Sequence, residues 1–168
     1  MTEGLEVDVS ISCPAWTAAL PGAQDLCRDA ALAAFLVAAP DVAWAEASLL
    51  LTDDAMVRDL NRTYRGQDKP TNVLAFPGLD DARAPGAPTM LGDVVVAFET
   101  TTAEAARSHT ALADHLSHLV VHGILHLLGH DHETDADAER MEGLESRVLA
   151  SLGVELAEAA APGDGEGR

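Results

Sequence analysis

Apolar and polar residues alternate over residues 5–11, a pattern typical of a half-buried β-strand. Three later stretches also read as strands: residues 44–51, residues 73–76, which Pro77 ends, and residues 91–97. Three consecutive valines in the last stretch indicate a strand that is buried on both faces. Together these patterns predict four strands.

The segments between and after the strands have sequence patterns typical of helices, and start and stop signals mark several helix ends. Thr52 is expected to cap one helix, with Asp53 and Asp54 in its first turn. Gly129 and Gly153 each follow a helix as a stop signal. We therefore expect helices over residues 22–39, 53–65, 99–128 (with a break near Ser108) and 136–152.

The strands and helices mix without strict alternation, so the expected fold class is α+β, a small mixed β-sheet of about four strands packed with about five helices. Neither a repeat nor a long linker divides the chain, so residues 1–153 are expected to form one domain. Residues 77–90 are rich in proline and glycine and predict a surface loop. Residues 154–168 are expected to form a disordered acidic tail, because apolar residues are scarce towards its end.

The chain of 168 residues carries a net charge of −18, from 10 basic and 28 acidic residues. This argues against a general nucleic-acid coat, because phosphate binding depends on Lys and Arg. A local basic site stays open, since residues 58–69 hold four of the ten basic residues. Two cysteines argue against a disulfide scaffold and a thiolate zinc site. With no membrane-length apolar run and no signal-peptide pattern, we expect a cytoplasmic protein.

All seven histidines lie between His109 and His132. His122 and His126 are four residues apart and therefore share one face of the predicted helix. Gly129 allows a sharp turn that brings a third imidazole, that of His132, to the same point. Three neutral imidazoles with one open position form the usual catalytic zinc site, so we expect one Zn²⁺ per chain. Imidazole ligands also suit nickel, copper and iron.

Further residues near these three have alternative roles. His130 competes with His132 as third ligand; we prefer His132 for its spacing after the glycine, which leaves His130 as a neighbour and a candidate proton carrier. His118, one turn before the first ligand, is expected to be a packed or supporting group, because a fourth protein ligand would close the site. Asp93 and Asp131 are candidates to orient the ligand imidazoles, and a plain turn or cap role fits each equally well.

The spacing HxxxHxxGxxH is shared with zinc proteases that carry HExxHxxGxxH, with one difference. The glutamate of those proteases, which acts as general base, is replaced by Gly123. Glycine has no side-chain proton acceptor, so a peptidase of that class is disfavoured. Close packing of the helix is a second explanation for Gly123, and the two explanations are compatible.

Three blocks of the sequence resemble the YbeY family of bacterial metal-dependent endoribonucleases, which are also called rRNA maturation factors. They are residues 60–77 (LNRTYRGQDKPTNVLAFP), residues 91–95 (LGDVV) and residues 118–132 (HLVVHGILHLLGHDH). With compatible elements around them, the resemblance covers residues 5–150. Where the family commonly reads GYDH, residues 129–132 read GHDH, so the ligand histidine is kept and one imidazole is added.

This resemblance implies an endoribonuclease that cleaves single-stranded RNA, matures the 3′ end of 16S rRNA and serves ribosome quality control. It implies a zinc ion held by His122, His126 and His132, and a functional arginine at Arg65. It also implies contacts with the small ribosomal subunit, its proteins and a ribosome-associated GTPase. Residues 1–153 are then the catalytic domain.

Four basic side chains, Arg58, Arg62, Arg65 and Lys69, are spaced four, three and four residues apart. If the helix extends to Lys69, they share one face. Arg65 is expected to reach towards the metal and to hold two phosphate oxygens, while the others contact neighbouring phosphates. A solvated helix face explains the same spacing. Tyr64 is the one aromatic candidate for base stacking, and burial against the sheet fits it equally well.

Two nucleophiles and two other functions stay open at this point. The phosphodiester can be attacked by a water activated at the metal or by an RNA 2′-hydroxyl. A non-catalytic, zinc-stabilised ribosome assembly factor predicts four protein ligands. Another metal-dependent hydrolase, peptidase-like, predicts a carboxylate from elsewhere near the metal, such as Asp93 or Asp131.

Overall fold

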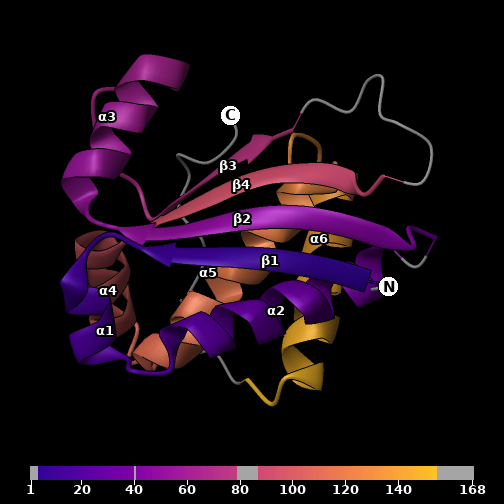
Figure 1. Cartoon of the computed structure of the whole chain (residues 1–168), viewed down its shortest axis with the longest axis horizontal. Coiled ribbons are helices and arrows are strands. Elements are labelled where there is room, and N and C mark those ends of the chain that lie inside the picture. The colour runs from indigo at the N-terminus through magenta and orange to yellow at the C-terminus, as the bar shows by residue number, and fades with distance from the viewer. Residues whose placement is uncertain (1–3, 40, 79–86, 155–168) are drawn as a thin grey trace.

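The computed structural model describes residues 4–39, 41–78 and 87–154 (Figure 1). Their four strands are β1 (Gly4–Ile11), β2 (Trp44–Thr52), β3 (Val73–Pro77) and β4 (Thr89–Ala97). Their six helices are α1 (Pro14–Ala19), α2 (Ala23–Ala38), α3 (Asp54–Arg65), α4 (Phe98–Arg107), α5 (Leu112–Leu127) and α6 (Asp135–Ser151).

The strands form one mixed sheet with the order β1-β2-β4-β3. β1 pairs with β2 and β2 with β4 in parallel, whereas β3 runs antiparallel to β4 at the edge. Helices α2, α5 and α6 lie on one side of the sheet, and α3 stands on the other side next to β3 and β4 (Figure 1). The expected α+β fold with a small mixed sheet is therefore confirmed, with one more helix than expected.

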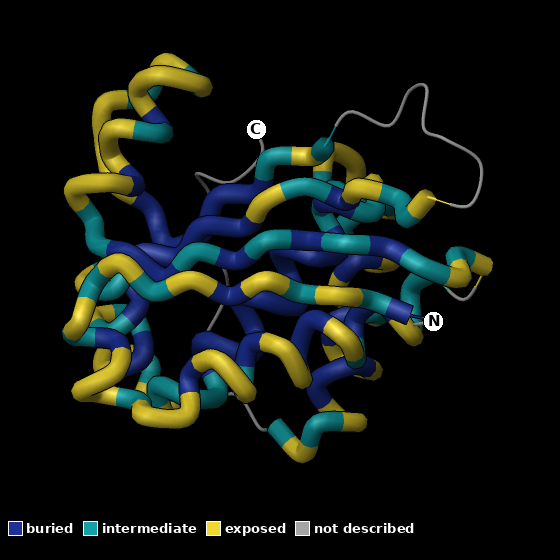
Figure 2. Tube along the Cα trace, in the orientation of Figure 1, coloured by how far each residue is buried: buried dark blue, intermediate teal, exposed yellow. Residues whose placement is uncertain are grey.

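Alternation along the strands separates the two faces of the sheet. On β2, Ala47 and Leu49 are buried in the main core, whereas Ser48 and Leu50 line the open face. The three valines of β4 are all buried, as the sequence predicts, because helices cover that strand on both sides. α5 is buried almost all round, since it lies between the sheet, α2 and α6 (Figure 2).

Two local differences from the expected elements have simple causes. Asp53, not Thr52, caps α3, since its backbone is extended and its side chain accepts a hydrogen bond from the Met56 N–H at 2.9 Å. Thr52 stays in β2 instead, where its Oγ1 accepts from the Ser12 hydroxyl at 2.8 Å. α1 is not predicted from the sequence, because a six-residue helix that begins at Pro14 has too little length for a periodic pattern.

The predicted break near Ser108 is confirmed, because α4 ends at Arg107 and α5 begins at Leu112. Within the break, His109 is exposed and adopts a φ of 57°. Parts of the predicted loop and tail, residues 79–86 and 155–168, lie outside the described residues. In the ranges that the structure describes, no helix combines the length and the apolar character needed to cross a membrane.

Candidate metal centre

Three histidine side chains converge at the C-terminal end of α5 and the turn that follows it. His122 and His126 lie one helical turn apart, with 3.1 Å between their Nε2 atoms and 4.6 Å between their ring centroids. The ring of His132 lies 5.8 Å from that of His122 and 5.5 Å from that of His126. One ring nitrogen from each residue lies within 4.8 Å of the others, so this group could hold a metal ion.

Gly129 provides the turn that brings His132 back to the helix end. Its φ of 99° lies in the region that favours glycine. Its N–H donates to the carbonyl of His126, and the N–H of His130 donates to the carbonyl of Leu125, both at 3.0 Å. This is the Schellman arrangement that closes a helix. The chain therefore reverses directly after α5, as the sequence predicts.

Gly123 lies on the side of α5 that faces the sheet. A Cβ atom at this position would lie 2.7 Å from Cγ1 and 3.0 Å from Cγ2 of Val94 in β4. Close packing therefore leaves no room for a larger side chain, including the glutamate of the zinc-protease motif. The packing explanation of this glycine is therefore confirmed.

A buried carboxylate that the sequence analysis did not single out supports two histidines. Glu145 of α6 is only 7 % exposed; its Oε2 lies 2.5 Å from Nδ1 of His122, and its Oε1 lies 3.0 Å from Nε2 of His118. Burial acts to raise the pKa of Glu145, but hydrogen bonds to the two histidines outweigh it and lower the pKa from 4.5 to about 2. The available signal was a charged residue on the buried side of α6, between Met141 and Val148.

A second network connects β3 with the helices. Glu104 of α4 accepts a hydrogen bond from Nδ2 of Asn72 at 2.9 Å and lies 2.8 Å from Nε2 of His115 in α5. The carbonyl of Asn72 accepts from the N–H of Ala97 at 2.9 Å. Asn72, directly before β3, is therefore hydrogen-bonded to α4 and to the end of β4, and Glu104 extends the network to His115 of α5.

Arg65 is the last residue of α3, and its guanidinium is held at β3. Its Nη2 donates to the carbonyl of Ala75 at 2.7 Å, and its central carbon lies 5.2 Å from the ring centroid of Phe76. α5 packs against the same strand. One short strand therefore connects the side chain of Arg65 with the helix that bears two of the histidines.

Lys69 does not share the helix face of the other basic residues of this segment. α3 ends at Arg65, as the expected helix over residues 53–65 does, because Gly66 adopts a φ of 70°. Lys69 therefore lies beyond the helix, and the condition for a face shared by all four basic residues is not met. Two of the arginines form exposed ion pairs: Arg58 with Asp68 at 2.7 Å and Arg62 with Asp59 at 3.0 Å.

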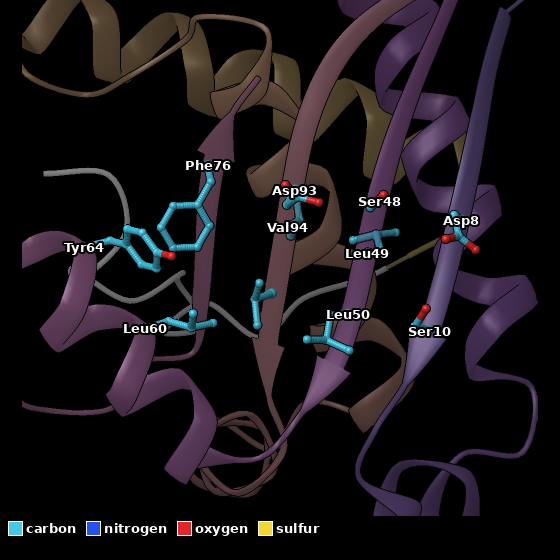
Figure 3. Close-up of a pocket in the computed structure, with 11 residues that line it drawn as sticks. Asp8, Ser10, Ser48, Leu49, Leu50, Leu60, Tyr64, Phe76, Asp93 and Val94 are labelled. Carbon is cyan, nitrogen blue, oxygen red and sulfur yellow. The ribbon is translucent and has the colours of Figure 1, made fainter. Parts of the chain in front are cut away.

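Asp93 lies on the open face of the sheet, away from α5. It lines a cavity of about 660 Å³ there, together with Tyr64 and Phe76 (Figure 3). Because successive side chains of a strand point to opposite faces and Val94 faces α5, Asp93 points away from the histidines. Its position gives no support to an orienting role. Tyr64 is 68 % exposed, with its ring centroid 5.7 Å from that of Phe76, so it is not buried against the sheet.

Asp131 and His130 both lie in the turn between α5 and α6. Oδ1 of Asp131 accepts a hydrogen bond from the Glu133 N–H at 3.3 Å, which is a turn contact. His130 is half-buried, and its backbone closes α5 as described above. These contacts agree with the plain turn role that the sequence also allowed for Asp131.

Comparison with known proteins connects this centre with one family. The family model described as Endoribonuclease YbeY matches residues 23–153. The proteins named Endoribonuclease YbeY from Paramagnetospirillum magneticum and Rhodospirillum rubrum are 55 % and 53 % identical to the chain. The first alignment covers 92 % of the chain and 96 % of the relative, and the second covers 83 % and 74 %. The solution structure of TM1509 from Thermotoga maritima shares the fold, with a TM-score of 0.57 at 20 % identity over 88 % of this chain and 92 % of that one. The chain therefore belongs to the Endoribonuclease YbeY family.

Proposed function

We propose that the protein is a zinc-dependent endoribonuclease that cuts single-stranded RNA, matures the 3′ end of 16S rRNA and serves ribosome quality control. The observation that carries this proposal is the convergence of three imidazoles in a chain whose relatives are named Endoribonuclease YbeY. Among the described residues the group has three members, which is the number that catalytic zinc sites use when a coordination position is kept for water or substrate.

His122, His126 and His132 are the proposed ligands of one Zn²⁺ per chain. The imidazole donor set suits zinc, and the closeness of the three ring nitrogens supports a common ion. When bound, zinc lowers the pKa of a coordinated water and polarises a phosphoryl oxygen. Nickel, copper and iron also accept imidazole ligands, and the metal content of freshly isolated protein distinguishes them.

Arg65 is the proposed catalytic arginine. Its planar guanidinium matches two oxygens of the phosphate that is cut, and its charge stabilises the negative charge that develops there. The hydrogen bond to the Ala75 carbonyl restrains the side chain, so less conformational entropy is lost when phosphate binds. Arg58, Arg62 and Lys69 are proposed to contact neighbouring phosphates, with the two arginines leaving their exposed carboxylate partners to do so.

The environment of Gly123 favours RNA over peptide as substrate. The contact with Val94 leaves no space for the general base of zinc proteases on α5. RNA brings its own nucleophile, the 2′-hydroxyl, and water is the alternative. Attack by the 2′-hydroxyl forms a 2′,3′-cyclic phosphate and releases a 5′-hydroxyl, so analysis of the product ends separates the two routes.

A non-catalytic zinc site would require a fourth protein ligand. His118 is the nearest candidate on α5, and its Nε2 lies 3.0 Å from the Glu145 carboxylate. Among the described residues, the group whose ligand atoms lie within 4.8 Å of one another contains three histidines and does not include His118. This argues against a closed site and therefore against a purely structural assembly factor.

The proposed place of action is the cytoplasm, on the small ribosomal subunit and its proteins, with a ribosome-associated GTPase as a further partner. A net charge of −18 supports the participation of a ribosomal protein, because the chain as a whole repels the phosphates of RNA.

The decisive experiment is cleavage of small-subunit precursor RNA by wild type, His126→Ala and Arg65→Ala, with and without a chelator. We expect chelation and either substitution to abolish or strongly reduce cleavage, while circular dichroism shows a retained fold. Arg140→Ala is the matched control, because Arg140 is an exposed arginine that pairs with Asp137 on α6. Metal-loaded wild type that cuts no RNA, alone or with ribosomal subunits, would rule out the enzymatic proposal.

A further inference from the structure

We propose that Glu145 is a positioning residue that holds His122 in the tautomer whose Nε2 faces the metal. In this proposal, a hydrogen bond from His118 keeps the Glu145 carboxylate in place. The inference rests on the proposed function insofar as the three histidines bind a metal. It assigns a task to two buried residues that are not themselves ligands.

The tautomer follows from the chemistry of the contact. A neutral imidazole carries its proton on one nitrogen, and a carboxylate only accepts hydrogen bonds. Nδ1 of His122 lies 2.5 Å from Oε2 of Glu145, so Nδ1 carries the proton and donates it to the bond. The lone pair is then on Nε2, the atom that faces Nε2 of His126 at 3.1 Å. Without the carboxylate, both tautomers and a flipped ring become accessible to His122.

His118 prevents the carboxylate from turning away. Its Nε2 donates to Oε1 of Glu145 at 3.0 Å, so each carboxylate oxygen is held by a different imidazole. The three residues are buried, with exposed fractions of 4 % for each histidine and 7 % for Glu145. Water therefore cannot replace either bond easily, and a lost bond leaves a buried charge poorly satisfied. The same contact occupies Nε2 of His118.

The position of Glu145 on α6 indicates that this carboxylate is there for a reason other than packing. Met141, Val148 and Leu149 share its buried side of the helix. An apolar residue at such a position normally stabilises a core as well as a buried charge does, or better. The carboxylate, unlike an apolar residue, determines which ring nitrogen of His122 is available to bind the metal. Carboxylates that fix the tautomer of a ligand histidine have this effect in metal sites generally.

The first test uses metal-free wild-type protein labelled with ¹⁵N at histidine. Long-range ¹H–¹⁵N spectra report which ring nitrogen is protonated. We expect His122 as the Nδ1–H tautomer and His118 as the Nε2–H tautomer. A proton on Nε2 of His122 would overturn the inference, and this result would not depend on metal binding or on activity.

The second test measures Zn²⁺ affinity by competition with a chromophoric chelator. In a glutamine at position 145, an NH₂ group takes the place of one carboxylate oxygen, so one of the two imidazole N–H groups loses its acceptor. We expect Glu145→Gln to bind Zn²⁺ about 10–100-fold more weakly than wild type. Glu142→Gln is the matched control, because Glu142 is an exposed residue on the same helix, and its affinity should equal that of wild type.

Position 118 keeps the inference testable if Glu145→Gln does not fold. His118→Gln retains an N–H donor near the place of Nε2 and should bind Zn²⁺ nearly as wild type does, whereas His118→Leu removes the donor and should bind more weakly. Equal affinities of Glu145→Gln and wild type, or of the two His118 variants, would refute the positioning role. If wild type binds no zinc at all, the proposed function fails instead, and the tautomer measurement still decides on Glu145.

Discussion

Replacing Gly123 by alanine tests the packing that sets α5 against β4. At an exposed position in a helix, replacing glycine by alanine stabilises the folded protein by about 1 kcal/mol. At position 123 the new Cβ would lie 2.7 Å and 3.0 Å from the γ-carbons of Val94, and overpacking of this kind costs roughly 1–3 kcal/mol. Together, the two effects predict that Gly123→Ala changes the free energy of unfolding by between zero and a loss of about 2 kcal/mol.

A double-mutant cycle isolates the crowding. Val94→Ala removes both γ-carbons, after which the atom nearest to the new Cβ is the Cβ of residue 94 at 3.5 Å, an ordinary contact. In that background, Gly123→Ala should stabilise the protein by about 1 kcal/mol, so the interaction between the two sites should be about 1–3 kcal/mol. Gly143→Ala in α6 is the control, because apart from its two chain neighbours and the backbone of its own helix no atom lies within 4 Å of its Cβ position. This substitution should stabilise the protein by about 1 kcal/mol in either background.

The assay is urea unfolding followed by far-UV circular dichroism, with a chelator present so that metal binding adds nothing to stability. The sign of the Gly123→Ala effect relative to Gly143→Ala is the critical quantity. If Gly123→Ala changes the unfolding free energy equally in the wild-type and Val94→Ala backgrounds, crowding against Val94 is not the reason for glycine here. The packing argument against a zinc-protease glutamate would then fall as well.

Two further predictions concern buried groups outside the metal centre. Burial raises the pKa of the Cys27 thiol from 9.0 to about 12, so between these values the unfolded chain has lost a proton that the folded protein retains. The Cys27 thiol therefore lowers the free energy of unfolding as the pH rises from about 9 to about 12. The difference in unfolding free energy between Cys27→Ala and wild type should change in that window and stay constant below it. Asn72→Ala should destabilise the protein by about 1–3 kcal/mol in urea, because Glu104 loses a donor in a largely buried site; a change below about 0.5 kcal/mol would contradict this account.

Local sequence alone was enough to find the three converging histidines. A spacing of four residues on a helix, a glycine directly after that helix and a third histidine in the turn are constraints within a few residues of one another. The Schellman closure at Gly129 realises them without help from distant parts of the chain. The strands and most helices were predictable for the same reason, since alternation and helical spacing are properties of short segments.

The N-cap of α3 shows where local signals become ambiguous. Thr52 and Asp53 are both good caps by residue type. The pairing of Thr52 with Ala97 of β4 keeps it in the sheet, and the cap moves one residue along to Asp53. The pairing of the strands therefore determines which of the two residues caps the helix, and the local sequence around the cap carries no information on that pairing.

Only the tertiary structure decided which carboxylates meet the histidines. Asp93, Asp131 and Glu145 are alike in type, yet strand alternation turns Asp93 to the opposite face of the sheet, whereas the packing of α6 on α5 brings Glu145 to a histidine 23 residues away in sequence. The crowding of Gly123 by Val94 is of the same kind. Local patterns show which residues share a helix face or a turn. Contacts between distant elements depend instead on how those elements pack, and this packing depends on all side chains of the core together.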